Sequence, residues 1–352
     1  MPVMTMLSPA LHPALHNALA TLATLVFAPV LRLFDNSQQS WWPTYLSGLT
    51  IAVVFYMWSR RRTAGLRGLV RYLWPKRLLR RPSVKLDIKF YLFGAAYLTL
   101  QGMALSGMNA LSDEMAGVAQ GAFHLTPHGH APGPVALAIM PLALYLAYEF
   151  GYWVSHLMLH RLPWLWEFHK VHHSAEVLTP LVEARQHPVE CVLVVMVCGV
   201  CYGVVFAVFK LIYGPGLELT GLWRPGLIML IMMATLVHIR HSHIKLSAPA
   251  WLSCIVQTPR QHQIHHSIDP RHFDRNLGFC LSVFDWLFGT LYIPKSNERL
   301  TFGLYDEAGQ PDELMASTRL VDHLWRPFQR AFGSPQNANT NQPSQTPPFP
   351  AE

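Results

Sequence analysis

The sequence predicts an all-α fold: a multi-pass transmembrane helical bundle with a cytoplasmic, histidine-rich, metal-binding cap. Hydrophobic residues make up 51% of the 352 residues, mean hydropathy is +0.22, and charged residues make up only 13%. That charged share is about half of what a soluble domain carries. Of the 19 histidines, thirteen lie between His156 and His272, directly after a long apolar run. Together these features favour a membrane protein with a polar, ligand-rich end.

Six apolar segments approach the roughly twenty residues that a helix needs to cross a bilayer. The expected spans are residues 18–34, 42–58, 90–107, 134–155, 191–213 and 222–238. The first is short enough to lie in the interface instead, and the last two form a hairpin that either crosses the bilayer or enters one leaflet.

Net charge is +7, and its distribution assigns the sides of the membrane. Eleven Lys and Arg lie between Arg60 and Lys89, where Asp87 is the only acid. Such a block between spans marks the cytoplasmic side, so no nucleic-acid partner is expected. Alternating the spans from there puts residues 156–190 and everything after 238 on the cytoplasmic face.

Four regions follow from these patterns. Residues 1–133 form N-terminal membrane helices with the basic loop and an outer loop, and 134–295 hold the histidines. Residues 296–333 are a C-terminal extension, and 334–352 are polar, Pro-rich and predicted to be disordered. Cys198 and Cys201 form a CxxC inside an apolar run, which favours small buried side chains over a redox or zinc motif.

The histidines fall into groups with helical spacing. His156 and His160 are four residues apart, and two later sets repeat H-x-x-H-H: His169, His172 and His173, then His262, His265 and His266. Residues three or four apart share one helix face, and neutral imidazole is the commonest nitrogen ligand for metals. Eight such rings exceed what one four-coordinate zinc can use, so they suit two metal ions of undecided identity.

Three further histidines lie between the two sets. Of His238, His241 and His243, His241 is the first choice as a ninth ligand and His238 the second. The isolated histidines are interpreted as structural: His12, His16, His124, His128, His130 and His323.

Residues 140–295 resemble the fatty acid hydroxylase / sterol desaturase superfamily of membrane di-iron enzymes. The resemblance rests on H-x3-H and two H-x2-H-H boxes in this order, on EARQHPVE with Arg185, His187 and Pro188, and on TPRQHQIHHS followed by Asn276, Gly278 and DWLFGT. Two positions depart from the pattern: Glu149 stands where relatives often carry Asp, and His243 where Asn is common.

The resemblance implies two iron ions held by the histidine boxes, O2 as co-substrate, a lipid substrate from the bilayer, and a separate electron donor. That donor would be a ferredoxin or a cytochrome b5-like protein with its reductase. It also implies a four-helix transmembrane core below the cytoplasmic cap.

Several other residues of this region have open roles. Glu149 either accepts a proton from a ligand ring or is an interfacial carboxylate, and His187 is a ligand or a neighbour of the substrate. Arg185 anchors a lipid headgroup or pairs with Glu183 or Glu190. Asp269, Asp274 and Asp285 either hydrogen-bond to ligand rings or cap turns.

The favoured function is an oxygenase that hydroxylates or desaturates a C–H bond of a sterol, fatty acyl or alkyl lipid. Both reactions begin with the same hydrogen abstraction, and no motif separates them. A metal-transporting or metal-storing membrane protein is the alternative, but it would place ligands and acids in mid-span. A haem-binding electron carrier needs axial histidines that face each other across a bundle, which adjacent His-His pairs do not provide.

Overall fold

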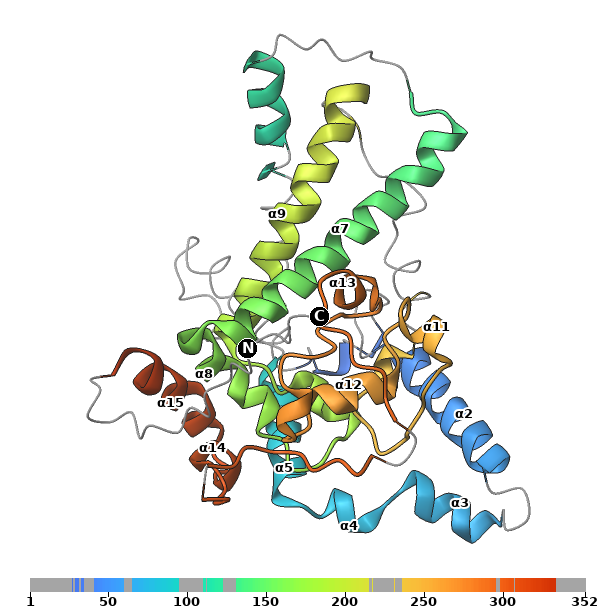
Figure 1. The fold of residues 1–352 in the computed structure, drawn as a ribbon, viewed down its shortest axis with the longest axis vertical. Coiled ribbons are helices and arrows are strands. Elements are labelled where there is room, and N and C mark those ends of the chain that lie inside the picture. The colour runs from blue at the N-terminus through green and yellow to red at the C-terminus, as the bar shows by residue number, and fades with distance from the viewer. Residues whose placement is uncertain are drawn as a thin grey trace, which may run out of the picture.

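The computed structural model describes residues 27, 29–31, 33–34, 41–59, 65–94, 110–111, 113–122, 131–214, 217, 231, 236–295, 298–306 and 308–333. Within these ranges the regular structure is helical, and β contacts are isolated bridges such as Val256–Leu281. Two long helices project from one side of a cap of shorter helices (Figure 1). The all-α prediction is therefore confirmed for the described part of the chain.

The two long helices are α7 (Pro134–Arg161) and α9 (Pro188–Tyr213). Both are long and apolar enough to cross a bilayer by length and composition. They match the expected spans 134–155 and 191–213, and both extend further into the cap than expected. As a result, His156 and His160 lie on the same continuous helix as the apolar run.

The remaining expected spans are not matched by a helix of this kind among the described residues. Span 42–58 forms α2 (Trp42–Ser59), which has too many polar and aromatic residues to count with α7 and α9. Its main contacts are with α3 (Leu66–Leu73) and with the 3-10 helix η3 (Val237–Ile239). Spans 18–34, 90–107 and 222–238 lie mostly outside the described residues, as does the predicted disordered tail.

The cap is built from short helices, half of which begin at a proline. Proline suits the first helical position because its missing N–H would have no intrahelical partner there. Prolines open α5, α7, α8, α9 and α12. The elements of the cap are α4 (Lys76–Leu79), α5 (Pro82–Phe93), α8 (Pro163–His173), η2 (Pro180–Ala184), α11 (Ala250–Ser253), α12 (Pro259–His265), η4 (Pro270–His272), α13 (Val283–Leu287), α14 (Glu313–Ala316) and α15 (Leu320–Phe332).

The cap core joins distant parts of the chain. Leu86 and Phe90 of α5 pack with Val171 of α8 and Leu314 of α14 in one buried cluster. The aromatic ring of Phe328 on α15 lies 5.0 Å from that of Phe168 on α8. The basic N-terminal segment and the C-terminal extension are therefore both integral parts of the cap.

The packing of α7 against α9 depends on Gly151. A Cβ atom at this position would lie 2.7 Å from the Cα atom of Cys198 and 3.2 Å from the carbonyl oxygen of Val197. Only a residue without a side chain lets the two backbones approach this closely. Cys198 is buried at the contact, which agrees with its interpretation as a small packing residue.

We expect Gly151→Ala to destabilise the protein by about 1–3 kcal/mol, because the added methyl group forces two rigid backbones apart. Thermal unfolding in detergent measures the effect. Gly121→Ala is the matched control, since a Cβ atom there meets nothing within 4 Å. An unchanged transition temperature for Gly151→Ala would contradict the observed helix approach.

Candidate metal centre

Nine histidines converge in two buried groups. The first group contains His156, His160, His169, His173 and His265, and the second contains His172, His241, His262 and His266. Within each group, one ring nitrogen per residue lies within 4.8 Å of all the others. The groups adjoin, because the rings of His173 and His266 stack with their centroids 4.5 Å apart.

The helical spacing explains how each set converges. His156 and His160 face one way on the last turns of α7, and His169 and His173 face them from α8. α12 presents His262 and His265, with His266 at its C-cap. A capping box fixes the start of α12: the Thr258 hydroxyl accepts the Gln261 N–H, and the Gln261 side chain accepts the Thr258 N–H.

Each of five rings is oriented by an acceptor at its Nδ1 atom. A carbonyl or carboxylate oxygen can only accept, so Nδ1 carries the proton and Nε2 carries a lone pair in the neutral ring. The pairs are His156 with the Leu277 carbonyl at 2.8 Å, His172 with the Arg185 carbonyl at 3.1 Å, His265 with the Arg275 carbonyl at 2.9 Å, His169 with Glu190 at 3.0 Å and His241 with Glu183 at 2.9 Å.

These tautomers bring unprotonated nitrogens together. The Nε2 atoms of His156 and His169 are 3.1 Å apart, and those of His172 and His241 are 3.2 Å apart. In both pairs each Nδ1 atom already faces an acceptor, so neither Nε2 has a proton to share. Two lone pairs at this distance repel each other unless a cation lies between them. The residues therefore fit a metal ion in each group.

Spacing and charge state agree with this fit. Two nitrogens bound to one ion at about 2.1 Å and at right angles lie about 3.0 Å apart. The buried Nε2 atoms of His160 and His265 have no hydrogen-bond partner. Burial lowers the pKa of His172, His173 and His262 well below the ordinary value, and that of His265 to about 3, so these rings are neutral at pH 7.

Each group also contacts one glutamate, which is buried in the first group and partly buried in the second. Glu190, in the first turn of α9, accepts from His169 of the first group. Glu183, in η2, accepts from His241 of the second group and from Arg240 at 2.7 Å. Although burial opposes it, the Arg240 guanidinium holds the pKa of Glu183 below its ordinary range, so Glu183 is anionic. The sequence suggested both glutamates only as partners of Arg185.

Arg185 has a different partner from those expected. Its guanidinium is 1% exposed and donates to Asp87 of α5 at 2.6 Å, to Ser174 at 3.1 Å and to the Ser83 carbonyl at 2.6 Å. These contacts include neither Glu183 nor Glu190, and no lipid-facing surface. The guanidinium instead fixes the segment whose backbone carbonyl holds the His172 ring.

His187 lies outside both groups. Its Nδ1 atom accepts the Val189 N–H as the N-cap of α9, and its Nε2 atom faces the Leu324 carbonyl of α15 at 3.1 Å. Both ring nitrogens are used, so these contacts give it a capping and packing role and leave no nitrogen for a metal. His238 also lies outside, with its Nε2 atom 3.3 Å from the Ser47 hydroxyl, and His243 packs on Tyr72.

Glu149 and Asp285 hold the loop that follows α12. Glu149 accepts from the Tyr145 hydroxyl at 2.7 Å and from the backbone N–H groups of Cys280 and Leu281, and these contacts include no ligand ring, which was one of the two roles left open for it. Asp285 accepts from the Leu277 and Gly278 N–H groups, both at 2.8 Å. Because the Leu277 carbonyl holds His156, both carboxylates act on the site through the backbone.

The other two aspartates differ from each other. Asp274 lies 3.4 Å from the Nδ1 atom of His160 and 2.9 Å from Arg161, so it contacts a histidine of the first group directly. Asp269 caps η4 and pairs with the exposed Arg271, which is the turn role that the sequence left open.

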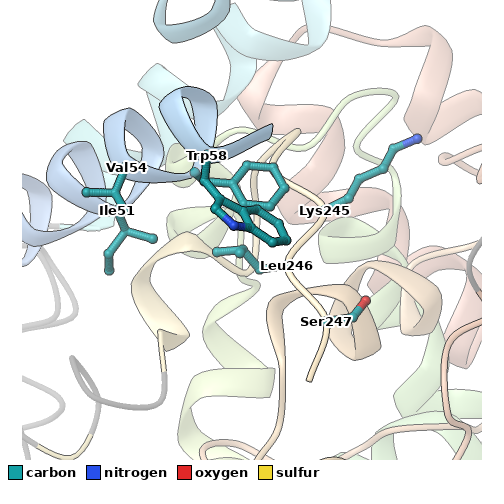
Figure 2. Close-up of a pocket in the computed structure, with 7 residues that line it drawn as sticks. Ile51, Val54, Trp58, Lys245, Leu246 and Ser247 are labelled. Atoms are coloured by element: carbon teal, nitrogen blue, oxygen red, sulfur yellow. The ribbon is translucent and has the colours of Figure 1, made fainter. Parts of the chain in front are cut away.

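A groove of about 570 Å³ lies elsewhere, between α2 and residues 245–247 (Figure 2). It is lined by Ile51, Val54, Phe55, Trp58, Lys245, Leu246 and Ser247. None of the nine histidines lines it. The groove is therefore separate from the histidine groups, although its 245–247 wall follows His241 closely in sequence.

Fold and site together define the class: an all-helical protein with two bilayer-length helices and a buried, nitrogen-rich site that fits metal ions. Residues 141–290 match the family model described as fatty acid hydroxylase. This family match covers the region that carries the histidine boxes and confirms the resemblance that those boxes predicted.

Curated relatives agree with this assignment. Alkylglycerol monooxygenase of Danio rerio is 26% identical over 190 residues, which cover 54% of this chain and 38% of that protein. The human protein of the same name is 24% identical over 185 residues, covering 52% and 37%. Ornithine lipid hydroxylase OlsE of Rhizobium tropici is 27% identical over 173 residues, covering 49% and 46%. The chain thus spans less than half the length of these relatives. No solved structure matches it.

We expect Asp87→Asn to destabilise the protein by about 3–5 kcal/mol, because it leaves the buried Arg185 charge without its counter-ion. Chemical unfolding in detergent measures the loss. The control is Glu176→Gln, which breaks the more exposed pair with Arg81 and should cost less than about 1 kcal/mol. Equal effects of the two substitutions would argue against a buried Asp87–Arg185 pair.

Proposed function

We propose that this protein is a membrane-bound, O2-dependent di-iron oxygenase that hydroxylates a C–H bond of a lipid. The convergence of unprotonated imidazole nitrogens in two adjoining groups is the observation that carries the proposal. The first group would hold one iron and the second group the other. Bound iron would supply the activation of O2 that an unactivated C–H bond requires.

The chain's own residues would orient and balance this site. Leu277, Arg185 and Arg275 present backbone carbonyls that fix the Nδ1 protons of three rings. Glu183 would add a negative charge beside the second group, which offsets part of the metal charge without occupying a coordination position, and Glu190 would orient the His169 ring of the first group. The buried location would exclude water from the reacting bond.

Hydroxylation is favoured over desaturation because the relatives named above are a monooxygenase and a hydroxylase. Both of those names refer to lipids that join a hydrocarbon chain to a polar head. We therefore propose an alkyl or acyl lipid of this kind as substrate. A separate donor, a ferredoxin or a cytochrome b5-like protein with its reductase, would supply electrons.

The proposed placement is a multi-pass membrane protein with its cap in the cytoplasm. α5 is tied to the cap through the Arg185–Asp87 pair, so the basic residues of α3 to α5 lie on the cap side. The positive-inside tendency of membrane proteins then favours the cytoplasm for that side. Residues 134–295 would form the oxygenase domain, with 296–333 packed onto it through α15.

Metal content tests the two-iron assignment. Purified protein should carry close to two irons per chain. We expect His160→Ala and His262→Ala, one in each group, to lower the iron content and to abolish lipid oxidation. The control is His238→Ala, which lies outside both groups and should keep its iron. One zinc per chain, or iron that survives both substitutions, would overturn the assignment.

Activity is tested with the reduced, iron-loaded protein in lipid nanodiscs under 18O2. Lipids that match the proposed class should gain one oxygen atom, seen as a mass increase that carries the 18O label. A product that has lost two hydrogens and carries no label would favour desaturation. Glu149→Gln is informative here, since we expect it to disturb the 277–281 loop and to lower both activity and iron content.

A further inference from the structure

Short helices α11 and α13 present a continuous apolar face. Five side chains in these helices or directly after them are between 47% and 68% exposed: Trp251, Ile255, Trp286, Leu287 and Phe288. The two elements adjoin, because the Ser282 N–H donates to the Ile255 carbonyl at 2.9 Å beside the Val256–Leu281 bridge. The single charged residue in 250–256 and 283–289 is Asp285, which is buried and fully used.

Aromatic contacts attach this face to α7 and show which part of the helix it packs against. The Phe288 ring stacks on Trp153 with centroids 4.6 Å apart, and the Phe284 ring lies 5.3 Å from Phe150. Two turns or less separate these α7 residues from His156. The face therefore lies at the junction of the long helices and the cap (Figure 1).

The exposed apolar side of α9 indicates where the hydrocarbon core of a bilayer would begin and end along the helix. Its exposed residues run from Val192 to Ile212, which spans about 30 Å at 1.5 Å per residue and equals the thickness of a hydrocarbon core. α7 and α9 run antiparallel, and Gly151 faces Cys198, so the level of Val192 corresponds to about residue 157 of α7.

By this measure Phe150 and Trp153 lie about 6–10 Å inside the edge of the hydrocarbon core that is nearer the cap. Amphipathic elements that rest in a membrane interface bury their apolar side chains to about 5–10 Å, and tryptophan is enriched at that depth. α11 and α13 lie on the side of the cap from which α7 and α9 project, whereas α3 and α4 lie on the opposite side (Figure 1).

We propose that the α11–α13 face is seated in the interfacial layer of the lipid bilayer. The cap would then be held against the membrane by its own surface as well as by the long helices. The proposal rests on the proposed function only in that α7 and α9 cross the bilayer, and it is independent of the metal chemistry.

Quenching by bromine-labelled lipid tests the proposal. The protein is placed in phosphatidylcholine nanodiscs whose acyl chains carry bromine near the headgroup, and tryptophan fluorescence is compared with unlabelled nanodiscs. We expect Trp251→Phe and Trp286→Phe each to remove part of the lipid-quenched signal. Trp74→Phe is the matched control, since Trp74 is 64% exposed on the opposite side of the cap and should leave the quenched signal unchanged.

A positive control distinguishes failure of this proposal from failure of the membrane placement of α7. Leu142→Trp places an indole on the exposed side of α7, where the bilayer should quench it strongly. If this indole is quenched while Trp251 and Trp286 are quenched only by aqueous acrylamide, the face lies in water, does not contact lipid, and the proposal is overturned. If the Leu142→Trp indole is not quenched either, the membrane placement of α7 in the proposed function fails.

Discussion

Repulsion between unprotonated imidazole nitrogens is the constraint around which the cap is organised. Bringing the Nε2 atoms of His156 and His169 to 3.1 Å without a shared proton is unfavourable on its own. The surrounding structure holds them there by hydrogen bonds at the opposite nitrogens, supplied by the loop after α12 and the first turn of α9. Asp285 in turn holds the backbone of Leu277, and the Arg185–Asp87 pair likewise fixes the carbonyl that faces His172. This polar framework is buried inside a chain in which 51% of the residues are hydrophobic.

Sequence spacing was sufficient to predict the histidines that converge. Intervals of three and four residues place rings on one helix face whatever the tertiary structure, so His169 and His173, or His262 and His266, were accessible from the sequence alone. His241 was also expected as the ninth member, and it lies in the second group. What spacing could not give was the division into two groups, since adjacent His172 and His173 point into different ones.

The supporting partners were beyond sequence reasoning because they are distant in the chain. Asp87 precedes Arg185 by 98 residues, and Glu149 reaches Cys280 across 131 residues. No local pattern marks such pairs, and nearby acids offered more obvious choices for Arg185. The membrane helices show the complementary case. Hydropathy located α7 and α9 but missed the end of α7 and the start of α9. The last turns of α7 carry histidines and the first turn of α9 carries a glutamate in place of apolar side chains, while the backbone remains helical.

The continuity of α7 has a consequence for substrate selection. From Leu142 to Arg161 the same unbroken helix carries exposed leucines at one end and His156 and His160 at the other. A helix of this length is stiff, so the height of the proposed oxidising site above a bilayer would depend directly on how deeply the helix sits in it. For a lipid held at its headgroup, the fixed distance along α7 would determine which carbon of the chain reaches the proposed site. Regioselectivity would then be set by a count of helical turns, with no need for side chains that recognise the chain itself.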